Sequence, residues 1–134
     1  MTTDRYQRGL AKMMEYTPPG GSASHQQIAD ELQNLAPDVP RYMVEFAFGD
    51  IYSRPGLTKQ EQAFVTVASL VTLGTDPQVE LHINTAITVG LTQDQIVSAL
   101  IHLLPYIGFP RVLNALAIAG RVFAERTSSP APAE

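Results

Sequence analysis

The stretch from Ala63 to Gly74 contains no charged residue. A surface helix shows one apolar stripe, whereas apolar or small residues cover nearly every side of this run. The pattern therefore predicts a central helix that is buried on most of its faces. Thr58 and Glu61 form a capping-box pattern that starts this helix, and Gly74 is a typical helix stop. The run is too short to span a bilayer, which takes about 20 apolar residues.

Asp76 and Pro77 predict the start of the next helix, with Asp76 as N-cap and Pro77 in the first helical position. Residues at helical spacing then form one stripe that should face the core: Val79, His82, Ile83, Ala86 and Gly90. His82 stands out because an imidazole titrates near neutral pH. It is either an acid/base group or a core histidine satisfied by one or two hydrogen bonds.

The same periodicity predicts helices over residues 4–16, 24–36, 38–53, 92–104 and 111–126. Ser24 with Gln27 and Thr92 with Gln95 repeat the capping-box pattern. The third of these helices should begin near Asp38 and break at Arg54-Pro55-Gly56, and residues 105–110 should form a tight connection. No segment alternates like a strand, so we expect an all-α fold.

The predicted domain organisation is simple. Residues 1–23 form an N-terminal helix and a Pro/Gly linker, and residues 24–126 form one helical domain. Residues 127–134 are a polar Pro/Ala tail that we expect to be disordered.

The amino-acid composition limits the kinds of molecule that the chain is expected to bind. The chain has 134 residues, 45% of them hydrophobic and only 16% charged, so we expect other subunits to cover part of its surface. A net charge of −4 without a Lys/Arg cluster argues against nucleic acid. The N-terminus lacks the apolar region of a signal peptide, and no run is long enough for a membrane helix. We therefore expect a cytoplasmic protein that binds neither nucleic acid nor membrane.

The chain has no cysteine, which excludes disulfides, thiolate nucleophiles and iron–sulfur clusters. His25, His82 and His102 are scattered and match no metal motif. No phosphate-binding loop or nucleophile elbow is present. Any chemistry should therefore depend on side-chain acids and bases, with no metal or cofactor.

Several motifs occur together in an order that resembles the carboxymuconolactone decarboxylase family. They are Gly49–Leu57 (GDIYSRPGL), Val65–Leu70, Val79–His82, Gly90–Thr92 with Ile96, and Pro105–Pro110 (PYIGFP). The resemblance implies the helical bundle shared with alkylhydroperoxidase D, assembled as trimers or hexamers. It also implies a reaction of aromatic catabolism, the cofactor-free loss of carbon dioxide from 4-carboxymuconolactone.

The chain also departs from the family patterns. The peroxidase branch has a Cys-x-x-Cys pair where this chain has Thr75 and Gln78, which excludes a thiol peroxidase. That branch also has a Glu at the position of Ala63. The decarboxylase branch often has Asn-Asn-Gly where this chain has Thr88, Val89 and Gly90. These departures leave the substrate open.

The resemblance implies roles for four residues. His82 would donate a proton to the substrate, and Arg54 would bind a carboxylate of a small anionic substrate. Tyr52 and Tyr106 would line the pocket. Each has a structural alternative, since Arg54 could hold the Pro-Gly turn and the tyrosines could lie at subunit contacts.

Two function classes follow from the sequence. One is a decarboxylase acting on a small carboxylated lactone or a related oxo-acid. The other is a non-catalytic ligand-binding or assembly module with the same fold.

Overall fold

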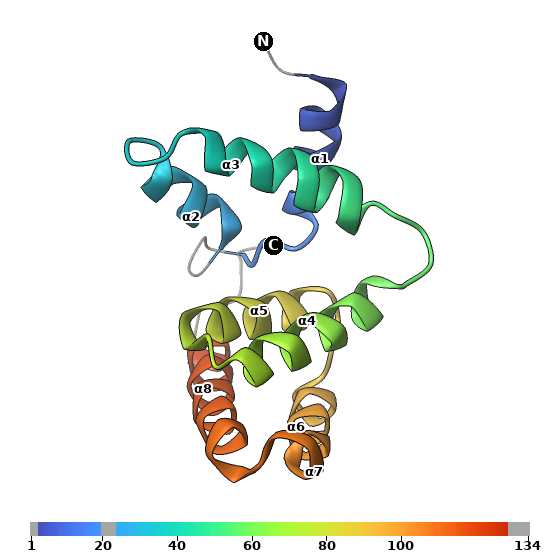
Figure 1. Cartoon of the computed structure of the whole chain (residues 1–134). Coiled ribbons are helices and arrows are strands. Elements are labelled where there is room, and N and C mark those ends of the chain that lie inside the picture. The colour runs from blue at the N-terminus through green and yellow to red at the C-terminus, as the bar shows by residue number, and fades with distance from the viewer. Residues whose placement is uncertain (1–2, 20–23, 129–134) are drawn as a thin grey trace. The chain divides into compact units, whose positions relative to one another are not determined.

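Figure 1 shows the computed structural model of the chain, which describes residues 3–19 and 24–128. Every regular element among these residues is helical, so the all-α prediction is confirmed. The chain divides into two units, Met1–Gln62 and Ala63–Glu134, and the boundary falls inside one helix. The predicted linker residues 20–23 lie outside the described residues.

The first unit is built from two helices and a long two-part helix. They are α1 (Asp4–Met14), α2 (His25–Leu32), α3 (Asp38–Tyr42) and η1 (Met43–Tyr52). The Ser24 hydroxyl accepts a hydrogen bond from the Gln27 amide at 3.1 Å, as the capping pattern predicts. α1 ends two residues earlier than expected.

The third helix differs from the prediction in its winding. It begins as an α-helix at Asp38 and continues from Met43 as a π-helix, and Figure 1 shows both parts as one teal-to-green ribbon. A π-helix has wider turns with i→i+5 hydrogen bonds. At its end the Ser53 hydroxyl donates to the Phe48 carbonyl at 2.6 Å. The hydrophobic pattern indicates a helix but not this change of period.

α1 and η1 approach each other closely at two glycines. A Cβ atom at Gly9 would overlap the Val44 carbonyl, and one at Gly49 would lie 2.9 Å from the Arg5 carbonyl oxygen. Arg8 also donates from Nε to the Gly49 carbonyl at 2.9 Å. The absence of side chains at these two positions therefore sets how closely the helices pack.

The second unit contains most of α4 (Lys59–Leu73) and four later helices. These are α5 (Asp76–Thr88), α6 (Gln93–His102), α7 (Leu104–Ile107) and α8 (Phe109–Ser128). α8 packs against α5, α6 and α7. All residues from 81 to 86 are buried, which makes α5 the central helix of this unit.

The burial predicted for α4 is wrong. Its buried residues form one stripe of Ala63, Val67 and Val71, while Val65 is 58% exposed and Leu73 is 69% exposed. The absence of charge in the sequence is compatible both with a helix that is buried within its own chain and with a helix whose apolar face is exposed.

Two capping boxes are confirmed. The Thr58 and Glu61 pair exchanges side-chain bonds with backbone amides at 3.1 and 2.8 Å, and Thr92 and Gln95 do so at 3.0 and 2.9 Å. Gly74 has φ +77°, as expected after a helix end.

Three predicted boundaries are corrected. Asp76 is the first residue of α5, and the N-cap is Thr75, whose hydroxyl donates to the Leu70 carbonyl instead of capping. Residues 105–110 include the short helix α7 and the start of α8. α8 continues through Ser128, into the predicted tail, and residues 129–134 lie outside the described part of the chain.

Candidate functional site

The four predicted site residues belong to different units. Tyr52 and Arg54 lie at the end of η1 and just after it, in the first unit. His82 is in α5 and Tyr106 in α7, both in the second unit.

Tyr52 is part of an aromatic cluster. Its ring stacks on Phe48 with centroids 4.5 Å apart and meets the edge of Tyr16 at 4.8 Å. The Tyr16 hydroxyl donates to Gln62, whose side-chain amide donates to the Tyr52 carbonyl at 3.2 Å. Burial raises the pKa of Tyr16 to about 12, so its hydroxyl stays protonated and a donor. The cluster fixes the Tyr52 ring in position.

Arg54 and Tyr106 are exposed. The Arg54 guanidinium lies 3.4 Å from the carbonyl of the neighbouring Pro55, a weak contact that agrees with a role in the turn. Tyr106 is 72% exposed, and its ring centroid lies 5.7 Å from that of His102 at the end of α6.

His82 lies on the inward side of α5, as predicted. It is 8% exposed, and Val79, Ile83 and Ala86 on the same stripe are at most 1% exposed. The imidazole is therefore largely shielded from solvent. Asn84 and Thr85 are also buried, so this short stretch of α5 holds three buried polar side chains.

A second polar stripe runs along α5 toward α8. Asn84 donates to the Glu80 carbonyl at 3.1 Å, and the Thr88 hydroxyl donates to the Asn84 carbonyl at 2.9 Å. Arg121 and Arg126 of α8 contact the two ends: Arg121 Nε lies 3.7 Å from Glu80 Oε1, and Arg126 Nη1 donates to the Thr88 hydroxyl at 3.2 Å. Burial lowers the pKa of Arg126. Thr88, which departs from the Asn-Asn-Gly pattern, thus accepts a hydrogen bond from α8.

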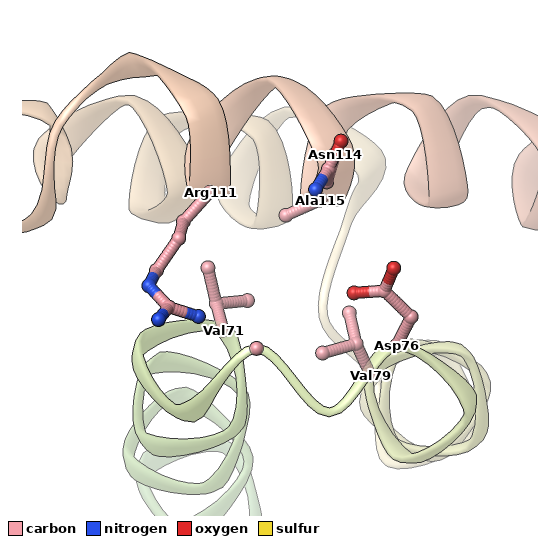
Figure 2. Close-up of a pocket in the computed structure, with 7 residues that line it drawn as sticks. Val71, Asp76, Val79, Arg111, Asn114 and Ala115 are labelled. Carbon is pink, nitrogen blue, oxygen red and sulfur yellow. The ribbon is translucent and has the colours of Figure 1, made fainter.

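A small cavity opens where α4 turns into α5, facing α8. It has a volume of about 80 Å³. Figure 2 shows Arg111 reaching from α8 to the end of α4, while Val71 and Val79 point into the space between the helices. Asp76, at the start of α5, turns its carboxylate toward α8, where Asn114 lies.

Polar groups supply most of the accessible lining of the cavity, and the buried side chains of Val71 and Val79 lie beneath them. Within residues 3–19 and 24–128, neither Arg111 nor Asp76 forms an ion pair within 4.0 Å. The Arg111 guanidinium packs onto Gly74, where a Cβ atom would overlap its Nη1 atom. All three polar side chains are exposed on their solvent side. This arrangement leaves the cation and the anion available to a ligand.

The sequence motifs point neither to Arg111 nor to the cavity. One signal was present: Arg111 lies in the first turn of α8, where the helix dipole disfavours a cation. An Arg at such a position indicates a partner elsewhere in the fold.

The described part of the chain has no helix that is long and apolar enough to cross a membrane. Its His, Asp and Glu side chains form no group of three that could hold a metal ion.

Comparisons with known proteins agree with the motifs. A model of the carboxymuconolactone decarboxylase family matches residues 37–121. The chain is 28% identical over 126 residues to 4-carboxymuconolactone decarboxylase of Acinetobacter baylyi, which covers 94% of this chain and 92% of that protein.

Two further relatives match over 96 residues. Nitrosuccinic acid decarboxylase npaB of Metarhizium robertsii is 25% identical, covering 69% of this chain and 67% of that protein. An uncharacterized 15.0 kDa protein of Paracoccus denitrificans is 28% identical, covering 70% and 72%. Together with the helical fold, the match over more than half of the sequence shows that the chain belongs to the carboxymuconolactone decarboxylase family.

Proposed function

We propose that this protein is a cofactor-independent decarboxylase of a small carboxylated lactone or a related oxo-acid, with His82 as the proton donor. The observation that carries the proposal is the placement of His82: a titratable ring, 8% exposed, on the apolar stripe of the central helix of the second unit. A shielded acid of this kind can deliver a proton to carbon without competition from bulk water.

The reaction needs an electron acceptor within the substrate. When the carboxylate leaves as carbon dioxide, its bonding electron pair moves into the conjugated lactone carbonyl and forms an enolate. Protonated His82 then transfers a proton to carbon, and the imidazole regains a proton from solvent.

The named relatives support a decarboxylase and leave the substrate open. One is named for a carboxylated lactone and another for nitrosuccinic acid. A lactone carbonyl and a nitro group can each accept the electrons released with carbon dioxide. We infer that the family fold serves acids with a neighbouring electron-withdrawing group, and that this chain takes an acid of that class.

Arg54, Tyr52 and Tyr106 are candidate substrate contacts in this proposal. Arg54 is exposed and carries a guanidinium fork suited to a carboxylate. Tyr106 presents most of its ring to solvent, whereas Tyr52 is held by the aromatic cluster. Of the two tyrosines, Tyr106 therefore has the greater freedom to meet a ligand.

We also propose that the protein works as a homotrimer or homohexamer in the cytoplasm. The support is the uncovered apolar surface on α4, where Val65 and Leu73 are each more than half exposed. Exposed apolar area of this kind on a helix marks a surface that a second protein surface can cover.

The alternative is a non-catalytic ligand-binding or assembly module. It is favoured by Ala63, which stands where the peroxidase branch has a Glu, and by Thr88, whose hydroxyl accepts a hydrogen bond from Arg126. The two functions make opposite predictions for the same variant.

The test is His82→Asn, with His102→Asn as the matched control because His102 is exposed at the end of α6. Single-turnover carbon dioxide release would be measured with 4-carboxymuconolactone and nitrosuccinic acid. If His82 donates the proton, turnover falls by ~10²–10⁴-fold while the melting temperature changes little. The control variant retains activity.

The module predicts the reverse result. His82→Asn would lose about 1–3 kcal/mol of stability, as expected for a disturbed buried polar group. An active wild type whose His82→Asn variant keeps full turnover per folded molecule would end the assignment of His82. A wild type inactive on all carboxylated lactones and oxo-acids tried would favour the module.

A further inference from the structure

The cavity between the α4–α5 turn and α8 has the features of a binding site for a small acid. Its polar groups lie apart: the Arg111 guanidinium is near Gly74, and the Asp76 carboxylate is on the α5 side (Figure 2). Between them lie the apolar side chains of Val71 and Val79. A ligand that contacts both groups must present a negative group to Arg111 and a hydrogen-bond donor to Asp76.

Two features of the site argue that Arg111 can accept a ligand. Its guanidinium has five N–H donors, and none of them bonds to another described residue. A guanidinium can hold a carboxylate through two parallel hydrogen bonds. Asn114, about one helical turn after Arg111 on α8, adds a side-chain amide at the edge of the cavity.

Asp76 limits what can bind. A second carboxylate at its end of the cavity would be repelled, whereas an ammonium or hydroxyl group could donate to it. The volume of about 80 Å³ is small. Since a water molecule needs ~10–15 Å³ of cavity volume, the cavity has room for a fragment of about five to eight heavy atoms.

We propose that this cavity binds a small monocarboxylic acid that carries an ammonium or hydroxyl group next to its carboxylate, with the carboxylate held by Arg111 and Asn114 and the neighbouring group held by Asp76. The proposal stands independently of the decarboxylase function because it concerns binding alone. It also differs from the candidate contact at Arg54, which belongs to the first unit.

Three acids of nearly equal size test the proposal on the full chain. Alanine, lactate and propionate differ only in the group beside the carboxylate: ammonium, hydroxyl or hydrogen. Amide chemical shifts would be followed during titration, with perturbations expected at Gly74, Val79 and Ala115, which line the cavity. Ligands of this size bind with Kd values of about 1 mM or weaker.

The expected order has alanine or lactate binding at least about threefold more tightly than propionate. Arg111→Gln should weaken binding of all three acids by about tenfold or more, the usual effect of losing a charged hydrogen-bond partner. Asp76→Asn should remove the preference for alanine over propionate, because the ammonium loses its counter-charge.

The matched control is Arg121→Gln. Arg121 lies on the same helix and is exposed like Arg111, but it contacts Glu80 outside this cavity. Its variant should bind all three acids like the wild type. A far-ultraviolet circular dichroism spectrum checks that each variant keeps its helices, and Arg111→Lys serves as a milder change if Arg111→Gln does not fold.

Several results would overturn the proposal. The first is the absence of chemical-shift changes at the cavity residues at ligand concentrations up to about 50 mM, well above the Kd expected for such small acids. The second is equal binding of the three acids. The third is unchanged binding by the Arg111 variants. An equal loss in Arg121→Gln would also overturn it, because the effect would then come from the overall charge of α8.

Discussion

Acid should destabilise the protein through His25, the first residue of α2. His25 is 7% exposed, and its ring meets Phe48 with centroids 4.9 Å apart. Burial disfavours the charged imidazolium and lowers the pKa of His25 from 6.5 to about 4. The folded chain therefore holds a neutral ring over a pH range in which the unfolded chain binds a proton.

The sign and size of the effect follow from linkage. Above pH 6.5 both states are neutral at this residue, and the stability is fully present. As the pH falls from 6.5 toward 4, His25 binds a proton in the unfolded state but not in the folded state, so the free energy of unfolding decreases. At ~1.36 kcal/mol per pKa unit, the loss between about pH 7 and about pH 4.5 is roughly 2–2.5 kcal/mol.

Urea unfolding followed by circular dichroism at these two pH values measures the loss. Carboxylates also contribute, because the pKa values of Glu15 and Asp50 are lowered by basic partners and their stabilisation falls at low pH. His25→Gln isolates the histidine: it should unfold with a pH dependence smaller than that of the wild type by roughly 2 kcal/mol. His102→Gln, at an exposed position, should behave like the wild type. Equal pH dependence in the wild type and His25→Gln would refute the reasoning.

Two further predictions test the packing. Gly9→Ala should lower the free energy of unfolding by about 2–3 kcal/mol, since the new methyl group would overlap the Val44 carbonyl across the α1–η1 contact. Urea denaturation measures this loss, and an unchanged unfolding midpoint would contradict the close approach of the two helices. Light scattering at micromolar concentration should give the mass of a trimer or hexamer. Val65→Glu, which places a charge on the exposed apolar face of α4, should reduce that mass, and a monomeric wild type would exclude the proposed assembly.

Local sequence patterns correctly predicted those features of the structure that depend on a few neighbouring residues. Thr58 and Thr92 cap their helices because the side chain and the amide it bonds are three residues apart, so no tertiary contact is needed. The inward placement of His82 could be predicted for the same reason: helical periodicity puts it on the stripe of Val79 and Ile83.

Features set by tertiary contacts were missed. The π-helical winding from Met43 was not predicted because the hydrophobic pattern is nearly the same for both kinds of helix. The close approach of η1 to α1 at Gly9 and Gly49 joins residues that are distant in sequence. The exposed side of α4 was missed because periodicity shows that residues are apolar and does not show what covers them. The aromatic cluster that holds Tyr52 likewise joins residues that are distant in sequence.

The position of Arg111 connects the two proposals. A cation in the first turn of α8 is disfavoured by the dipole of its own helix, and its side chain extends to Gly74, at the carboxyl end of α4, where a dipole favours positive charge. That end is followed directly by α5, whose Val79 lines the cavity. His82 comes three residues after Val79 and therefore lies one helical turn further along the same face. The proposed proton donor and the proposed acid-binding cavity thus share one face of α5, and a change that rotates or shortens the first turn of α5 should disturb both.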